Sequence, residues 1–160
     1  MSDVKSLYET DLVAWSKEQA EGLRAVARGG TNQPLDWENL AEEIEDLGAS
    51  QRAALQSQLR RIIEHFLKLE YSPARDPRRS WRSSIVDARI EVEVLLERNP
   101  SLAREAGAMA AAEHPRAARK AIADLEEHGE LSPSALPRIR STCYTADQII
   151  GDWFPPDPLP

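Results

Sequence analysis

Three charged side chains lie at the edges of the apolar stripes that the sequence predicts: Glu43, His65 and Arg89. With 100° between successive helical residues, each lies about 80° from the centre of its own stripe. A side chain at that angle is half-buried, where a charged group needs a partner. We therefore predict a polar cluster of these residues between three packed helices. A network that fixes which helices pair is the favoured interpretation, and a proton-handling site is the alternative.

A second group of residues forms an arginine-rich segment: Arg75, Arg78, Arg79 and Arg82. Arginines beside an aromatic ring can hold phosphates while the ring stacks on a base, and they also suit the carboxylates of a protein surface. Trp81 is in phase with the apolar stripe that follows, which favours a core position for its ring. Pairing inside the molecule, with the acidic helix over 36–48 for example, is favoured over a partner-binding patch.

The sequence contains no recognisable metal site or catalytic motif. The histidines His65, His114 and His128 have no acidic residue three positions before them, so the Glu-x-x-His pairs of di-iron bundles are absent. Asp124 and His128 are expected to form a solvated pair at a helix end. The one cysteine, Cys143, has no identifiable base and is expected to be a small buried apolar residue. We therefore assign no catalytic, cofactor-binding or metal-binding residue, which argues against an enzyme.

The elements that position these residues are all expected to be helices, because apolar residues recur with helical spacing and never with strict two-residue alternation. Long helices are expected over 11–28, 36–48, 50–71, 80–98 and 101–128, with a short helix after Thr145. Gly29-Gly30 and Gly48 are expected to end the first two. Pro115 is expected to kink or restart the fifth, because proline removes a helical hydrogen bond. The chain from 130 to 144 is expected to be irregular.

The apolar stripes are narrow, so each must pack against another stripe. The stripe of the second expected helix consists of Trp37, Leu40, Ile44 and Leu47. The chain of 160 residues fits one domain. We predict an all-α fold: one domain over 1–160, a bundle of about five long helices with a short C-terminal helix and an extended proline-rich tail at 155–160.

The charge changes sign along the chain. Residues 1–50 hold 4 basic and 11 acidic side chains (net −7), residues 51–90 hold 9 and 4 (net +5), and residues 91–160 hold 7 and 12 (net −5). An acidic helix beside a basic one explains this pattern, and a basic patch for an acidic partner is the alternative. The overall charge of −7 argues against nucleic acid. No bilayer-spanning segment and no secretory signal is recognisable, so we expect a cytoplasmic protein without membrane contact.

Several segments resemble the bacterial family called domain of unknown function 29. The most distinctive is Asp36-Trp-Glu-Asn-Leu-Ala-Glu-Glu-Ile-Glu-Asp-Leu-Gly48. Others include Tyr8-Glu-Thr-Asp, Ala14-Trp15, His65 with Lys68, Ser80-Trp81-Arg82 and Cys143-Tyr144-Thr145. The resemblance covers nearly the whole chain. It implies an all-helical fold in cytoplasmic bacterial proteins, but no activity, substrate or cofactor. Pro115 departs from the unbroken helix that the family leads us to expect.

Three functions remain as hypotheses from the sequence. The absence of catalytic motifs and the segregated charge favour a non-enzymatic helical module that binds a protein partner or a second copy of itself. One alternative is an enzyme or small-ligand-binding protein that uses Glu43, His65 and Arg89. The other is a protein that binds single-stranded nucleic acid through residues 75–82.

Overall fold

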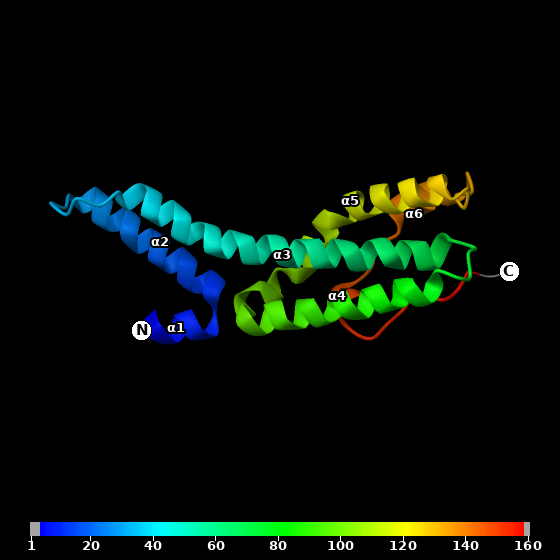
Figure 1. Cartoon of the computed structure of the whole chain (residues 1–160), viewed down its shortest axis with the longest axis horizontal. Helices are drawn as coiled ribbons and strands as arrows, with labels where there is room; N and C mark the ends of the chain where they lie inside the picture. Colours follow the sequence, from blue (N-terminus) through cyan, green and yellow to red (C-terminus); the bar gives the residue numbers. More distant parts are fainter. Residues whose placement is uncertain (1–3, 159–160) are drawn as a thin grey trace. The chain divides into compact units, whose positions relative to one another are not determined.

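The computed structural model describes residues 4–158, and the regular structure within that range is entirely helical (Figure 1). The prediction of an all-α fold is therefore confirmed. The elements are α1 (Val4–Thr10), α2 (Leu12–Gly29), α3 (Trp37–Tyr71), α4 (Arg78–Arg98), the 3-10 helix η1 (Pro100–Arg104), α5 (Ala106–Glu127), α6 (Ala135–Ser141) and α7 (Ala146–Ile150).

Local capping explains why several helices begin and end where the sequence predicts. Asp11 precedes α2, and its Oδ1 accepts a hydrogen bond of 2.8 Å from the Ala14 N–H. Gly30 closes α2 with a φ of 70°, a conformation that glycine adopts without strain. α3 ends at Tyr71, just before Ser72-Pro73. Thr145 begins α7 in a complete capping box with Gln148.

The prediction that Gly48 ends a helix is wrong, because Gly48 lies inside α3, a continuous helix of 35 residues. Glycine costs only about 1 kcal/mol in a helix interior. Gly48 is buried, and packing on this face of α3 compensates for that cost.

Prolines also lie inside helices where the sequence predicts breaks. α5 runs through Pro115 without ending. α6 lies in the segment expected to be irregular, with Pro137 in its first turn. First-turn N–H groups have no intrahelical partner, so proline loses nothing there. α1 is a further helix that the apolar spacing did not predict.

The described chain forms two compact units. The first consists of residues up to Ala54 together with Val94–Arg104, and the second of Leu55–Glu93 and Glu105 onward. α3 and α4 therefore contribute residues to both units. The organisation as a single domain stays a prediction.

Within the first unit, α2 and α3 pack through small residues. Ser16 and Ala20 of α2 and Ala41 and Gly48 of α3 are buried. A Cβ added to Gly48 would lie 2.3 Å from the Ser16 Oγ and 3.6 Å from the Val13 Cα. A side chain at position 48 would therefore collide with the Ser16 hydroxyl, whereas the α2 backbone would lie at an ordinary contact distance.

A buried polar network completes the first unit. Asn99 is fully buried; its Oδ1 accepts a hydrogen bond of 3.1 Å from the Val13 N–H, and its Nδ2 donates to the Leu95 carbonyl and to Gln51 Oε1. Asp11 Oδ2 accepts a hydrogen bond of 2.6 Å from the Ser101 N–H. These bonds tie the first turn of α2 to the turn between α4 and η1.

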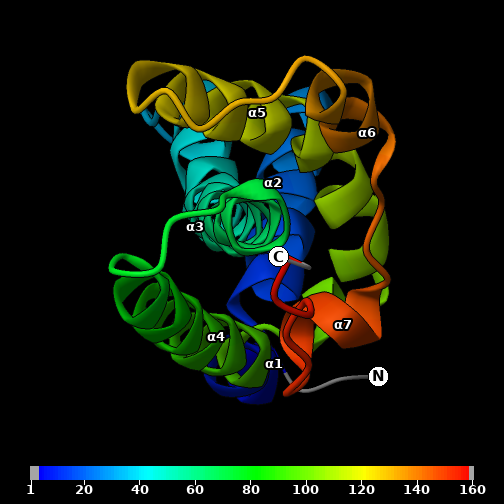
Figure 2. The same ribbon diagram turned by 90° about the vertical axis from the view of Figure 1, so that its right-hand side faces the viewer.

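The second unit has a core of large apolar side chains. Its fully buried members include Leu55, Leu59, Ile62, Phe66, Ile85, Val92, Ile139 and Ile149. The ring of Phe66 contacts three aromatic rings of the C-terminal segment, those of Tyr144, Trp153 and Phe154. Figure 2 shows α7 and the tail beside α4 in this unit.

Candidate functional site

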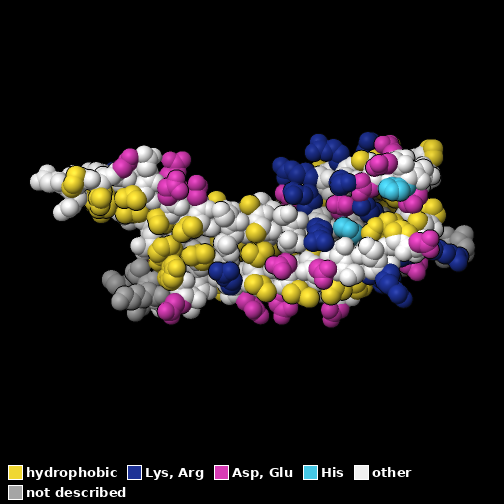
Figure 3. Space-filling model, in the orientation of Figure 1, with side chains coloured by type: hydrophobic (Ala, Val, Ile, Leu, Met, Phe, Trp, Pro, Cys, Tyr) yellow, Lys and Arg dark blue, Asp and Glu magenta, His cyan; other side chains and the backbone are white. Residues whose placement is uncertain are grey.

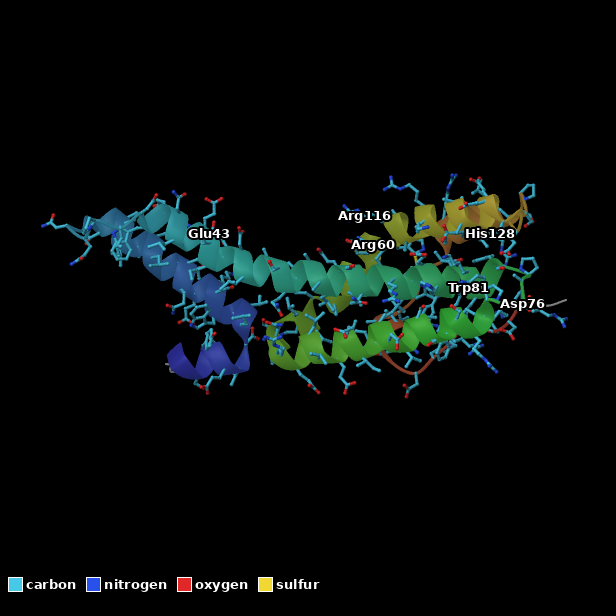
Figure 4. The ribbon with its side chains drawn as sticks, viewed as in Figure 1. Glu43, Arg60, Asp76, Trp81, Arg116 and His128 are labelled. Carbon is cyan, nitrogen blue, oxygen red and sulfur yellow. The ribbon has the colours of Figure 1, made fainter. Side chains whose placement is uncertain are left out.

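Two leucines on the first half of α3 are left outside the packing of the first unit. Leu40 and Leu47 are 41% and 44% exposed, and Glu43 lies exposed between them (Figure 4). The spacing i, i+3, i+7 puts all three on one helix face. We call Leu40, Glu43 and Leu47 the α3 stripe. It is a continuous apolar and acidic surface in the first unit.

The prediction that the stripe Trp37, Leu40, Ile44, Leu47 packs fully against another helix is wrong for its two leucines. The residues of α3 that are buried against α2 are Ala41 and Gly48, to one side of that stripe. Close backbone approach at these small residues leaves Leu40 and Leu47 at the edge of the contact.

The surroundings of the α3 stripe are strongly acidic. Residues 36–47 contain six acidic side chains and no basic one. Glu45 accepts a hydrogen bond of 2.6 Å from Arg24 of α2. Figure 3 shows acidic side chains gathered over the first turns of α3. The stripe therefore lies in a region of negative potential.

The structure does not bring Glu43 to His65. Both lie on helix α3, where 22 positions separate them. Glu43 belongs to the first unit, whereas His65 and Arg89 belong to the second.

His65 lies half-buried on α3 within the second unit. Its Nδ1 is 2.8 Å from the Arg61 carbonyl oxygen one turn earlier. Burial lowers the pKa of the His65 imidazole below its ordinary value, and the neighbouring charges of Glu64 and Lys68 act in opposite directions. The ring is therefore held in its neutral form near neutral pH.

Arg89 braces the C-terminal segment within the second unit. Its guanidinium donates hydrogen bonds of 2.5–2.9 Å to three main-chain carbonyls, those of Gln148, Ile149 and Trp153. The guanidinium carbon also lies 4.8 Å from the centre of the Phe154 ring and 5.4 Å from that of Phe66. The partners of Arg89 are therefore main-chain carbonyls of the C-terminal segment.

The arginine-rich segment divides into two engaged and two exposed side chains. Arg78 donates to the Leu69 carbonyl and forms an ion pair of 2.6 Å with Asp157 of the tail, which Arg82 also approaches at 3.5 Å. Arg75 and Arg79 are exposed. The favoured pairing inside the molecule is therefore present for Arg78 and Arg82. Their partner is the tail, and not the acidic helix.

A charged network in the second unit went unrecognised in the sequence. Lys68 is 8% exposed, and its Nζ lies 2.9 Å from Glu64 and 2.5 Å from Asp124. Lys120 pairs with the other oxygen of Asp124. Burial opposes the charge of Asp124, but the hydrogen bonds from Lys120 and Lys68 outweigh it and lower the pKa of the carboxyl group. The sequence contains one sign of this network: Glu64 and Lys68, and likewise Lys120 and Asp124, are spaced i, i+4 and carry opposite charges.

A cavity of about 170 Å³ adjoins this network. Lys68, Asp124, His128 and Glu130 line it together with Trp81, whose ring is half-buried. The His128 Nδ1 contacts the main-chain carbonyl of Asp124 at 2.7 Å, so the expected side-chain pair of these two residues is replaced by a main-chain contact. Each of the two carboxylates already has a hydrogen-bond donor within the molecule.

A buried carboxylate, that of Glu113, also lies on α5. Glu113 is 3% exposed, and its two oxygens accept hydrogen bonds from Arg60 at 2.9 Å and Arg116 at 2.8 Å. Figure 4 labels the two arginines near each other, Arg60 on α3 and Arg116 on α5. The next residue, His114, is buried with an Nε2 that has no hydrogen-bond partner among the described residues. Burial lowers the pKa of the His114 imidazole.

The expectation of a buried cysteine is wrong, since Cys143 is exposed. It lies in the extended segment between α6 and α7, where no helix face is available to cover it. Among the described residues, no group of three His, Cys, Asp or Glu side chains is arranged to hold a metal ion. Within the same residues, every helix is too short or too polar to cross a membrane.

Comparisons with known proteins agree with this geometry at the level of the fold. The crystal structure of an alpha-helical protein of unknown function from Rhodospirillum rubrum is similar, with a TM-score of 0.70 and 30% sequence identity over 91% of this chain and 89% of that one. No curated protein matches the chain. The family model described as domain of unknown function DUF29 matches residues 7–154. The resemblance noted in the sequence is thereby confirmed, and the chain belongs to the DUF29 family.

Proposed function

We propose that the protein is a cytoplasmic, non-enzymatic helical module that binds a basic amphipathic helix of another protein through the α3 stripe. The observation that carries this proposal is the exposure of Leu40 and Leu47 in a helix whose small residues are buried. A partner helix would cover the two leucines and place a basic side chain opposite Glu43. This is helix-on-helix recognition with anchors at i, i+3 and i+7.

The apolar part of the α3 stripe supplies the affinity in this proposal. Burial of apolar surface stabilises a complex by roughly 25 cal/mol per Å². The leucines are two turns apart, so one helix laid along α3 can contact both. Contacts around a small apolar centre typically dominate the binding free energy of an interface.

The charge around the stripe argues for a basic partner over a second copy. Two copies joined through the stripe would each bring the six acidic side chains of residues 36–47 into the interface. Like charges placed together in an interface cost several kcal/mol. Glu43 forms no ion pair within the described residues, and so it is free to pair with a lysine or arginine of the partner.

The two alternative functions have weaker support. A catalytic acid or base must lie within hydrogen-bond reach of its partners, about 2.6–3.2 Å, and Glu43 lies far along α3 from His65. Binding of nucleic acid through residues 75–82 competes with Asp157, which already occupies Arg78 and Arg82.

The experiment is a fluorescence anisotropy titration with two model peptides of equal length. One carries leucines on one face and lysines beside them, and the other has glutamates in place of the lysines. We expect the lysine peptide to bind, and Leu40→Ser/Leu47→Ser to weaken its affinity at least tenfold. Glu43→Lys should weaken it less, and only at low salt, because exposed charges are screened.

The matched control is Val86→Ser/Ile90→Ser, which removes two equally exposed apolar residues from α4. We expect it to bind the lysine peptide as the unmodified protein does. Equal affinity for the two peptides, or full binding by Leu40→Ser/Leu47→Ser, would contradict the proposal. If light scattering detects a dimer that Leu40→Ser/Leu47→Ser abolishes, the partner bound by the α3 stripe is a second copy of this chain and not a helix of another protein.

A further inference from the structure

A groove lies between α5 and α6 in the second unit, and none of the functions above uses it. Its volume is about 410 Å³, and it is lined by Pro115, Ala118, Arg119, Ile122 and Arg140. Figure 2 shows α5 and α6 side by side, and the two helices contact each other. The volume falls within the range of about 300–1,000 Å³ that is typical of small-molecule sites.

The groove combines an apolar floor with two positive charges. Pro115, Ala118 and Ile122 supply the apolar surface, and α5 and α6 each supply one arginine. Among the described residues that line the groove, none is acidic. A ligand that matches this lining has an apolar body and an anionic end.

The two groove arginines differ from their basic neighbours in having no partner. Arg60 and Arg116 share Glu113, and Lys120 pairs with Asp124. Arg119 and Arg140 are exposed and form no ion pair or side-chain hydrogen bond within the described residues. These three basic side chains around the groove are therefore paired with carboxylates, whereas the two arginines that line it form no ion pair within the described residues.

We propose that this groove binds an aliphatic carboxylate, with its chain on Pro115, Ala118 and Ile122 and its carboxylate between Arg119 and Arg140. A guanidinium binds a carboxylate through two parallel hydrogen bonds. Elsewhere in this chain arginines are also paired with carboxylates, as Arg78 is with Asp157, whose Oδ1 accepts hydrogen bonds from both Nε and Nη2. Arg119 and Arg140 have no such carboxylate partner within the described residues, and the bound ligand supplies one.

Isothermal titration with decanoate tests this proposal, with decylamine and 1-decanol as charge controls. We expect decanoate to bind with a dissociation constant below about 1 mM and the other two to bind at least tenfold more weakly. Each methylene removed, from decanoate to octanoate, should lower the affinity by up to about fourfold, since burial of one methylene contributes about 0.8 kcal/mol. Acetate should not bind.

Two variants and one control locate the site. Arg119→Ala and Arg140→Ala should each weaken decanoate binding about tenfold or more, and the double variant should abolish it. Arg79→Ala removes another exposed arginine of the same unit and should leave binding unchanged. Helical circular dichroism and the urea midpoint should be the same for all of these variants, because the arginines are at the surface.

Other results would overturn the proposal. These are decanol or decylamine binding as tightly as decanoate, or the double variant binding as the unmodified protein does. If decyl phosphate binds much more tightly than decanoate, the anionic group that the groove prefers is a phosphate and not a carboxylate. Tight binding of an acidic peptide without decanoate binding would reassign the groove to a protein partner.

Discussion

Each of the two units is stabilised internally by a different kind of interaction. In the first, small residues bring α2 and α3 close together, and a buried polar network around Asn99 and Asp11 fixes the ends of the helices. In the second, large apolar side chains surround Phe66, and Arg89 joins the aromatic cluster to the C-terminal segment. In the first unit, where small residues form the contact between α2 and α3, Leu40 and Leu47 remain at the surface. In the second unit, the large side chains themselves form the contacts and are buried.

The largest expected effect of a single substitution lies in the second unit. Phe66→Ala removes a fully buried ring and its contacts with Tyr144, Trp153 and Phe154. We expect it to lower the free energy of unfolding by about 3–5 kcal/mol, from lost burial and the cavity left behind. Urea denaturation followed by tryptophan fluorescence measures this. Val86→Ala, at an exposed site, should change stability by less than about 0.5 kcal/mol.

The first unit should respond most to the loss of its buried amide. Asn99→Ala removes the acceptor for the Val13 N–H and the donor to the Leu95 carbonyl. A buried group left without a partner costs about 1–3 kcal/mol. The same denaturation experiment measures the effect. Asn39→Ala also removes an amide hydrogen bond, to Asp36, but at an exposed position, so a loss as large as that of Asn99→Ala would refute the buried network.

A pair of substitutions tests whether small residues set the spacing of α2 and α3. Gly48→Ala alone should destabilise by about 1 kcal/mol, because crowding against Ser16 Oγ outweighs the gain in helix propensity. In a Ser16→Ala background the same change should stabilise by about 1 kcal/mol, since the next neighbours lie at 3.6 Å.

Gly22→Ala is the matched control for this pair. A Cβ at Gly22 has no neighbour within 4 Å, so only helix propensity changes. It should stabilise by about 0.5–1 kcal/mol in both backgrounds. Stabilisation by Gly48→Ala in both backgrounds would mean that the Ser16 hydroxyl does not restrict the residue opposite it.

The smallest expected effect is a pH dependence that belongs to the second unit, which contains all three histidines of the chain. Burial lowers the pKa of His65 and His114 in the folded protein. Between that lowered pKa and the ordinary value of about 6.5, the unfolded chain binds more protons, so stability falls as the pH falls. Urea midpoints at pH 7.5 and 5.5 should therefore differ.

His114→Gln should reduce that difference, because one of the two buried imidazoles is gone. His128→Gln serves as the control, since His128 is exposed. An equal pH dependence in the unmodified protein and in His114→Gln would show that burial of this ring does not contribute to acid sensitivity.

The features that follow from local chemistry were predictable from the sequence. The caps at Asp11 and Thr145 and the stop before Ser72-Pro73 depend on side chains within a few residues of each other. The prediction that a helix ends at Gly48 was wrong, because the small free-energy cost of glycine in a helix is offset by packing against α2. Propensity alone contains no term for that contact.

The candidate sites were predictable only in part, for a related reason. Helical spacing identified the apolar stripe that contains Leu40 and Leu47, but spacing does not say which neighbour covers a stripe. Lys68 and Asp124 are 56 positions apart, and Arg78 and Asp157 are 79 positions apart. Such pairs form only when the tertiary fold brings distant segments together, so no local sequence pattern predicts which two residues pair.

The contact between Gly48 and Ser16 constrains how these two positions can change during evolution. A relative that carries alanine at the position of Gly48 should carry alanine or glycine at that of Ser16. A relative with a larger side chain at the position of Ser16 should retain glycine opposite it. The two sites are therefore expected to covary as a pair, and their joint substitutions should record how the spacing of the two helices has diverged within the family.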